Sequence, residues 1–173
     1  MYNAVCAFGV GDLLGIEKEK IIKGISEFKL TAKRMDIQLI KKNIKVINDS
    51  YNASYDSMKA ALEFMKNNKA SRKIAVLGDM LELGEYTNKL HQKVGEEVVK
   101  NKIDILMTVG IYAKEIAKMA RQLGIKEVFE FRSVQDALEY LKENIKEGDL
   151  ILLKASNAMN FSAILEGLKE QYN

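Results

Sequence analysis

Short apolar runs recur along the chain, and each is followed by a longer segment whose apolar residues have helical spacing. The clearest runs are IAVL at 74–77 and LILL at 150–153. A strand that is apolar at every position is buried on both faces of its sheet, which is typical of parallel sheets covered by helices on both sides. The pattern therefore predicts an α/β fold with a doubly wound, mostly parallel sheet of about six strands.

This alternation also predicts where the strand-to-helix loops lie. Because right-handed crossovers connect parallel strands, these loops fall at one edge of the sheet. The first two strands are close enough along the chain to pair as a hairpin. We expect strands at 35–40, 44–48, 73–77, 105–109, 128–131 and 150–153, and helices at 57–67, 87–100, 113–123, 134–144 (capped by Ser133) and 161–171.

The N-terminal segment has a different pattern, rich in small apolar residues. It predicts two helices, at 4–14 and 17–28, with Gly15 ending the first. The change of pattern at LTAKR predicts a domain boundary near residues 30–34. The expected parts are a short helical segment at 1–32 and an α/β domain at 33–173.

Composition and motifs exclude several classes of protein. The net charge is only +3 and lysine is interspersed with glutamate, so we expect no nucleic-acid partner, which would need a concentrated basic surface. Cys6 and His91 are the only cysteine and histidine, which argues against a disulfide framework, a zinc site and a Ser-His or Cys-His hydrolase. FGVGDLLG at 8–15 lacks dinucleotide-fingerprint spacing and indicates helix packing through small residues, and no G-x-x-x-x-G-K-[ST] occurs.

The hydropathy pattern bears on location. No run approaches the ~18 apolar residues of a membrane span. The N-terminus lacks the basic region of a secretory signal. We therefore expect a cytoplasmic protein with no membrane partner.

Polar side chains cluster directly after the strand at 44–48. Asp49 can accept from a ribose hydroxyl or a positioning arginine, or it can cap a turn. Tyr51 offers an aromatic face and a hydroxyl to a ligand, or it packs half-exposed. Asn52 and Ser57 suit an amide ligand, or they form an Asx turn and a helix cap, the cap being favoured for Ser57.

Four further groups of side chains bear on a possible ligand site. Arg34 can bind a phosphate in bidentate fashion or remain a surface charge. Asp79, Glu82 and Glu85 suit a divalent ion or a cationic amine, or they are solvated loop acids. His91 is expected to be partly exposed or a hydrogen-bonded packing residue, and not a metal ligand, because it has no companion. The loop of Lys154, Ser156 and Asn157 precedes a helix. It is either an anion-binding site or a loop that is polar without binding a ligand.

Four segments carry a resemblance to a known family. NDSYNASYDSMKAAL (48–62) resembles the D-x-Y-N-A-[NS]-P-x-S-M-x-A-A-[LI] signature of the Mur ligases that add D-alanyl-D-alanine. VLGDMLELGE (76–85), followed by His91, looks like their second signature, LGDM-x-ELG…H. YNAVCAFGVGDLLGI and KRMDI resemble the helix that closes their central ATPase domain and the start of their C-terminal domain. The order and spacing agree along essentially the whole chain.

The resemblance implies an activity in peptidoglycan precursor synthesis. Such enzymes use ATP to phosphorylate the carboxyl end of a UDP-N-acetylmuramoyl tripeptide, and the amine of D-Ala-D-Ala then attacks the acyl phosphate. ATP and Mg²⁺ are held mainly by the family's other domains. By position, Asn3, Arg34, Asp49 and Tyr51 look like nucleotide-binding residues. Asn52, Ser57, Lys154, Ser156 and Asn157 would face the dipeptide.

The sequence departs from the family pattern at two places. Tyr55 stands where the pattern has proline, and Asn157 stands where it has arginine. We expect the C-terminal domain of such a ligase with a helical remnant of the ATPase domain, inactive by itself. The alternative is a non-catalytic doubly wound binding or interaction module that dimerises through its N-terminal helices.

Overall fold

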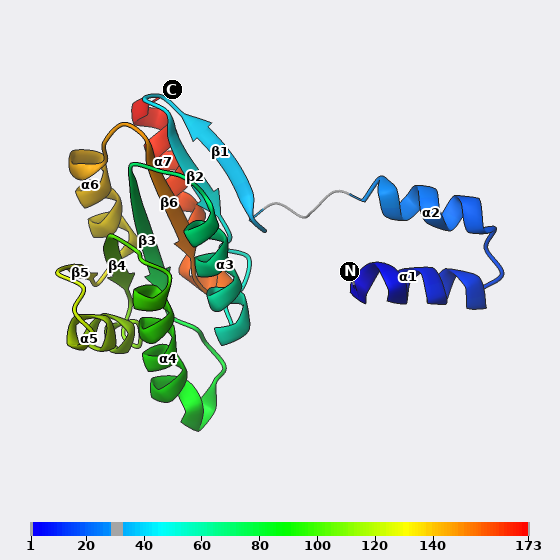
Figure 1. The fold of residues 1–173 in the computed structure, drawn as a ribbon, viewed down its shortest axis with the longest axis horizontal. Helices are drawn as coiled ribbons and strands as arrows, with labels where there is room; N and C mark the ends of the chain where they lie inside the picture. Colours follow the sequence, from blue (N-terminus) through cyan, green and yellow to red (C-terminus); the bar gives the residue numbers. More distant parts are fainter. Residues whose placement is uncertain (1, 29–32, 173) are drawn as a thin grey trace. The chain divides into compact units, whose positions relative to one another are not determined.

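The computed structural model describes residues 2–28 and 33–172 and divides the chain into two compact units, Met1–Thr31 and Ala32–Asn173 (Figure 1). Most of the predicted boundary region lies outside the described residues. The assignment of the first part to an ATPase domain stays a prediction.

The elements in chain order are α1 (Tyr2–Leu13), α2 (Lys18–Ser26), β1 (Asp36–Ile40), β2 (Ile44–Asn48), α3 (Tyr55–Asn67), β3 (Arg72–Gly78), the 3-10 helix η1 (Gly84–Tyr86), α4 (Thr87–Lys100), β4 (Ile105–Val109), α5 (Lys114–Gln122), β5 (Glu127–Phe131), α6 (Val134–Asn144), β6 (Asp149–Lys154), the 3-10 helix η2 (Asn157–Met159) and α7 (Ser162–Tyr172).

The first unit is a pair of helices joined by a tight turn. Gly15 ends α1 with a φ of 71°, and the amide of Ile16 donates to the carbonyl of Gly11 at 3.0 Å, which is the bonding of a Schellman motif. A Cβ on Gly11 would lie 2.9 Å from the side chain of Ile21 on α2, so the small residue permits the close approach of the two helices, as predicted.

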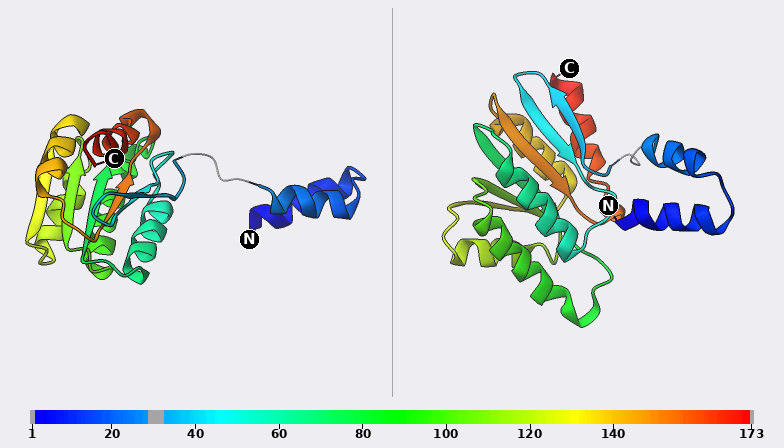
Figure 2. Two further views of the ribbon diagram at one scale, coloured as in Figure 1. Left: turned by 90° about the horizontal axis from the view of Figure 1, so that it is seen from above. Right: turned by 45° about the vertical axis from the view of Figure 1, so that its right-hand side comes forward.

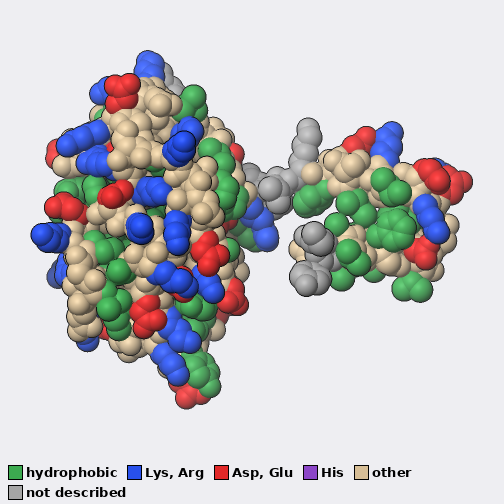
Figure 3. Space-filling model, viewed as in Figure 1, with side chains coloured by type: hydrophobic (Ala, Val, Ile, Leu, Met, Phe, Trp, Pro, Cys, Tyr) green, Lys and Arg blue, Asp and Glu red, His purple; other side chains and the backbone are tan. Residues whose placement is uncertain are grey.

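The surface of this unit is unusually apolar. Asp12 is the one charged residue of α1, and Figure 3 shows apolar side chains over much of the unit's visible face. Val5, Leu13 and Phe28 are all more than half exposed. A helix that is apolar all round is normally buried against other protein. Within the described ranges, no helix is both long and apolar enough to cross a membrane.

The second unit is a six-stranded sheet in the order β1-β2-β6-β3-β4-β5, with β1 antiparallel to β2 and the other neighbouring strands parallel. Helices α3, α4 and α5 cover one face and α6 and α7 cover the other (Figure 2), each layer with its own apolar core. The predicted α/β class, the hairpin and the mostly parallel sheet are confirmed.

The strand order creates a switch point beside β6. The chain leaves β2 and β3 toward helices on one face of the sheet, whereas it leaves β6, which lies between them, toward α7 on the other face. Connections that diverge in this way open a crevice beyond the carboxyl ends of the strands. The loops after β2, β3 and β6 border that crevice.

The start of α3 differs from the prediction. The helix begins at Tyr55, and its N-cap is Ser54, whose hydroxyl accepts from the amide of Ser57 at 3.4 Å. Ser57 completes a capping box from the third helical position, so its prediction as the cap is wrong. Tyr55 occupies the first helical position, where proline is common because the amide there needs no partner. Its hydroxyl instead donates to Glu97 at 3.4 Å, so the departure from the family pattern costs the helix little.

Replacing Ser54 with alanine is expected to lower the free energy of unfolding by about 1 kcal/mol, because the first turn of α3 loses its side-chain acceptor. Urea denaturation measures the change. Ser57→Ala is the matched control and is expected to cost less, since it leaves the N-cap oxygen in place. A larger loss for Ser57→Ala than for Ser54→Ala would contradict this reading of the helix start.

Candidate functional site

The three loops at the switch point enclose a pocket of about 380 Å³. Its size falls within the roughly 300–1,000 Å³ of small-molecule sites. It brings together five of the candidate residues, Glu82 among them, with two others from the same loops. The lining consists of Tyr51 and Asn52 after β2, Leu81 and Glu82 after β3, and Ser156, Asn157 and Ala158 after β6.

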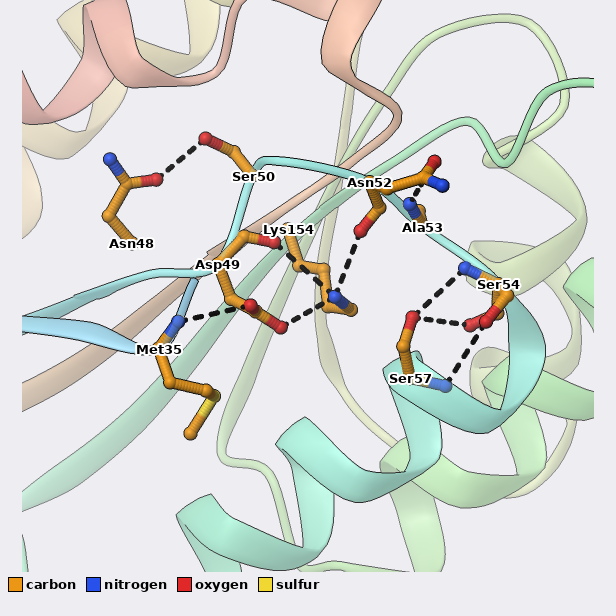
Figure 4. Close-up of polar contacts among 9 residues, drawn as sticks. All are labelled: Met35, Asn48, Asp49, Ser50, Asn52, Ala53, Ser54, Ser57 and Lys154. Atoms are coloured by element: carbon orange, nitrogen blue, oxygen red, sulfur yellow. Dashed lines mark hydrogen bonds and ion pairs between the residues drawn. The ribbon is translucent and has the colours of Figure 1, made fainter. Parts of the chain in front are cut away.

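A buried ion pair joins the ends of β2 and β6 (Figure 4). The ammonium of Lys154 lies 2.5 Å from the carboxylate of Asp49, and the two side chains are 2% and 13% exposed. The same ammonium donates to the carbonyls of Asp49 at 3.3 Å and Asn52 at 3.1 Å. Its three hydrogens therefore all have acceptors within the loop after β2. Lys154 braces this loop, and its charge is not offered to the open crevice.

Asp49 also organises the entry to the sheet. Its second carboxylate oxygen accepts from the amide of Met35 at 3.1 Å, just before β1. The neighbouring Arg34 stacks its guanidinium over the Tyr51 ring, 4.2 Å from the centroid, and the amide of Tyr51 donates to the carbonyl of Lys33 at 3.0 Å. Three of the predicted nucleotide-binding residues thus lie together at one side of the pocket.

Asn3, the fourth predicted nucleotide residue, lies in the first unit. It is exposed on α1 and lines an apolar groove of about 560 Å³ between α1 and α2. Its role as a nucleotide contact stays a prediction.

The two predicted amide-binding residues after β2 behave differently. The side-chain oxygen of Asn52 accepts from the amide of the next residue, Ala53, at 2.8 Å, so it does not form the predicted Asx turn, which needs the amide two residues on. The Asn52 side chain remains exposed at the pocket. Ser57 is engaged with Ser54 in the capping box and does not line the pocket. The structure therefore places Asn52, and not Ser57, where a ligand can reach it.

Ser156 and Asn157 also divide their roles. The hydroxyl of Ser156 is buried and accepts from the amide of Leu81 at 2.9 Å, while its own amide donates to the carbonyl of Asp79 at 3.1 Å. It ties the loop after β6 to the loop after β3. Asn157 starts η2 and is exposed at the pocket rim.

The predicted acidic group is split by the fold. Asp79 is buried, and its carboxylate accepts from the amides of Ile111, Tyr112 and Ala113 at 3.0, 2.9 and 2.7 Å, ahead of α5. Gly110 is required beside it, because its φ is 121° and a Cβ there would lie 2.5 Å from the carboxylate. Asp79 is thus neither a metal or amine ligand nor a solvated acid, and both interpretations are wrong for this residue. Within the described ranges, no three His, Cys, Asp or Glu side chains are placed to hold a metal ion.

His91 is fully buried on α4 and is a hydrogen-bonded packing residue, one of its two predicted environments. Its Nε2 accepts from the amide of Met80 at 3.0 Å, which leaves Nδ1 to donate to the carbonyl of Thr87 at 2.6 Å. Only the neutral ring satisfies both bonds. Burial lowers the pKa of His91 below its ordinary value, and the neighbouring Thr87 carbonyl and the Asp79 and Glu115 carboxylates offset this in part.

A second polar cluster was not predicted. Asn48, Ser50 and Ser162 are buried together, with the Ser50 hydroxyl donating to the Asn48 amide oxygen at 2.6 Å and the Asn48 amide nitrogen 3.4 Å from the Ser162 hydroxyl. The cluster joins the end of β2 to the start of α7, residues far apart in the chain. Without the strand order, no local pattern could have revealed it.

Residues 33–157 match the family model described as Mur ligase, glutamate ligase domain. The UDP-N-acetylmuramoyl-tripeptide–D-alanyl-D-alanine ligase of Bacillus subtilis (strain 168) is 38% identical over 170 residues, which are 97% of this chain and 37% of that protein. The protein of the same name from Rickettsia prowazekii (strain Madrid E) is 32% identical, with coverages of 90% and 34%. The chain spans about one third of the length of these relatives.

Solved structures agree on the fold. The MurF ligase from Thermotoga maritima in complex with ADP has a TM-score of 0.73 at 24% identity, covering 95% of this chain and 36% of that one. Crystal structure I of MurF from Acinetobacter baumannii has a TM-score of 0.78 at 24% identity, covering 97% and 36%. The predicted resemblance to the C-terminal part of these ligases is confirmed. With the family model matching most of its length, the chain belongs to the Mur ligase family and carries the family's glutamate ligase domain.

Proposed function

We propose that this chain serves as the C-terminal domain of an ATP-dependent ligase that joins D-Ala-D-Ala to a UDP-N-acetylmuramoyl tripeptide through an acyl phosphate. One observation carries the proposal. The two segments that resemble the family signatures, 48–62 and 76–85, are separated in the chain but both line the pocket at the switch point. Relatives with this activity in their names align with nearly the whole chain.

The nucleotide side of the site is assigned to the residues around Tyr51. The exposed Arg34 guanidinium can reach a phosphate, and the Tyr51 ring holds it in place. Asp49 keeps unused lone pairs for a ribose hydroxyl, although Lys154 and Met35 already engage both oxygens. Asn3, in the first unit, is assigned to the nucleotide by the family resemblance alone.

This chain offers residues that can bind part of ATP but none that would hold Mg²⁺ among those described. The exposed Arg34 and Tyr51 fit one end of a nucleotide, which supports a role in holding ATP. The described residues offer no acidic cluster for the metal and no phosphate-binding loop motif occurs in the sequence, so the triphosphate and Mg²⁺ are assigned to the ATPase domain of the complete ligase. The apolar surface of α1 and α2 suits packing within that domain.

The dipeptide side of the site is assigned to the rim formed by Asn52 and Asn157, with Ser156 fixing the loops between them. Their neutral amides can pair with a peptide group and with a carboxylate. Lys154 and Ser57 stabilise the loops and do not contact the dipeptide in this proposal, because their polar atoms are engaged in the loop after β2 and in the capping box.

A ligation assay tests the proposal. The chain is fused after the corresponding upstream part of the Bacillus subtilis relative and supplied with ATP, Mg²⁺, UDP-N-acetylmuramoyl tripeptide and D-Ala-D-Ala. We expect formation of the amide product with release of ADP and phosphate, and no phosphate release from the unfused chain. A folded fusion that binds ATP but forms no product would contradict the assignment, and so would substrate-dependent phosphate release by the unfused chain.

The exposed apolar surface of α1 and α2 also supports a second candidate, a stand-alone module that dimerises through these helices. Light scattering on the chain distinguishes the two. A dimer that dissociates in the Val5→Lys/Leu13→Lys variant, together with an inactive fusion, would favour the module.

A further inference from the structure

The pocket has an uneven distribution of charge. Of the seven residues that line it, Glu82 alone carries a charged side chain. Lys154 and Arg34 are not among the lining residues, since Lys154 is surrounded by oxygens of Asp49 and Asn52 and the Arg34 guanidinium stacks over Tyr51. In the described part of the chain, no hydrogen bond or ion pair engages the Glu82 carboxylate. The pocket therefore offers one unpaired negative charge beside neutral amides.

The backbone that carries Glu82 is held in place from below. The amide of Met80 donates to buried His91 and the amide of Leu81 donates to buried Ser156, at 3.0 and 2.9 Å. Glu82 itself adopts a left-handed conformation with a φ of 64°. A residue other than glycine pays for such a conformation, and it persists where the surroundings enforce it, often at ligand sites. The hydrogen bonds of the Met80 and Leu81 amides hold the backbone in place beside Glu82, whose side chain lines the pocket.

We propose that Glu82 binds the α-ammonium group of the dipeptide, while Asn52 and Asn157 receive its peptide and carboxylate groups. The inference rests on the proposed function and deepens it, because it separates the two ligands along the rim. A phosphate placed at Glu82 would meet like charge, so the nucleotide belongs at Arg34 and the amine-bearing substrate at Glu82. Glu82 is a binding and positioning residue, and no proton transfer is assigned to it.

Titration of the full chain with two probes tests this assignment. D-Ala-D-Ala carries the ammonium group, and N-acetyl-D-Ala-D-Ala lacks it while keeping the carboxylate. Dissociation constants come from amide chemical-shift changes in the wild type, Glu82→Gln and Glu85→Gln. Glu85 is the matched control, since it is an exposed acid three residues further on that does not line the pocket.

We expect D-Ala-D-Ala to bind about tenfold more weakly to Glu82→Gln, in keeping with the loss of one charged hydrogen bond, and unchanged to Glu85→Gln. The acetylated probe should bind wild type and Glu82→Gln equally weakly. Equal affinity of D-Ala-D-Ala for wild type and Glu82→Gln, or undiminished affinity for the acetylated probe, would overturn the inference. So would the absence of any shift at the pocket.

The fused ligase separates this inference from the proposed function. In that enzyme, Glu82→Gln should raise the KM for D-Ala-D-Ala about tenfold and leave the KM for ATP unchanged. Normal ligation with an unchanged dipeptide KM would refute the role of Glu82 while the proposed function stands. Absence of ligation by the wild-type fusion would refute the proposed function itself.

Discussion

Replacing Lys154 with methionine is expected to lower the free energy of unfolding by about 3–5 kcal/mol, since it leaves a mostly buried carboxylate without its partner. The side chain is 2% exposed and donates to the Asp49 carboxylate and to two carbonyls of the same loop. All three acceptors lose their donor at once. Urea denaturation of the variant measures the loss.

Two controls establish that the effect belongs to the pair. Asp49→Asn combined with Lys154→Met should cost clearly less than the sum of the single changes, because the double variant leaves no uncompensated charge. Lys45→Met, an exposed lysine of β2 at the opposite end of the strand, should change stability by less than about 0.5 kcal/mol. A loss for Lys154→Met no larger than for Lys45→Met would contradict the bracing role.

The second large effect is a pH dependence that originates at His91. Burial lowers the pKa of the folded imidazole, whereas the unfolded chain titrates near 6.5. As the pH falls below about 6.5, the unfolded state takes up a proton that the folded state resists, so stability is lost toward acid pH. The slope from this one group approaches at most about 1.4 kcal/mol per pH unit. Protonation would also remove the acceptor of the Met80 amide.

Unfolding free energies measured between pH 7 and pH 5 test this prediction. His91→Gln is the informative variant, because its amide oxygen can still accept from Met80 but does not titrate. It should be less stable at pH 7 and show a flatter slope across this range. An identical slope in wild type and His91→Gln would assign the pH dependence to other groups.

The fold could be predicted well because its signals are local. Runs such as IAVL and LILL identify buried strands, and periodicity placed α4, β4 and α6 within their observed bounds. Ser133 caps α6 as expected, accepting from the amide of Asp136. The start of α3 was misplaced because Ser54 and Ser57 have equal chemistry for capping, and only the backbone shows which is first.

The site was only partly predictable, because its key contacts are non-local. Asp79 binds amides 32 to 34 residues away, and the partner of Lys154 lies 105 residues away. The sequence places Lys154 in a loop, either as part of an anion site or as simple loop polarity, although it is the last residue of β6, a strand that is buried throughout. If the position of β6 beside β2 were known, Lys154 could be paired with Asp49, but the order of strands in a sheet cannot be predicted from the hydropathy pattern. Glu82 was singled out only as one of three acids, since its left-handed backbone leaves no trace in the sequence.

The central claim is that the carboxyl edge of β2, β6 and β3 is the ligand-binding edge of this chain. An amide chemical-shift map of the isotope-labelled chain, titrated with D-Ala-D-Ala, tests it most directly. The opposite edge provides an internal control, a pocket of about 320 Å³ lined in part by Asn43, Ser71 and Gly148. We predict saturable shifts confined to residues 49–53, 79–82 and 154–158. Shifts that gather at the opposite pocket, or a map with no saturable shifts, would contradict the account.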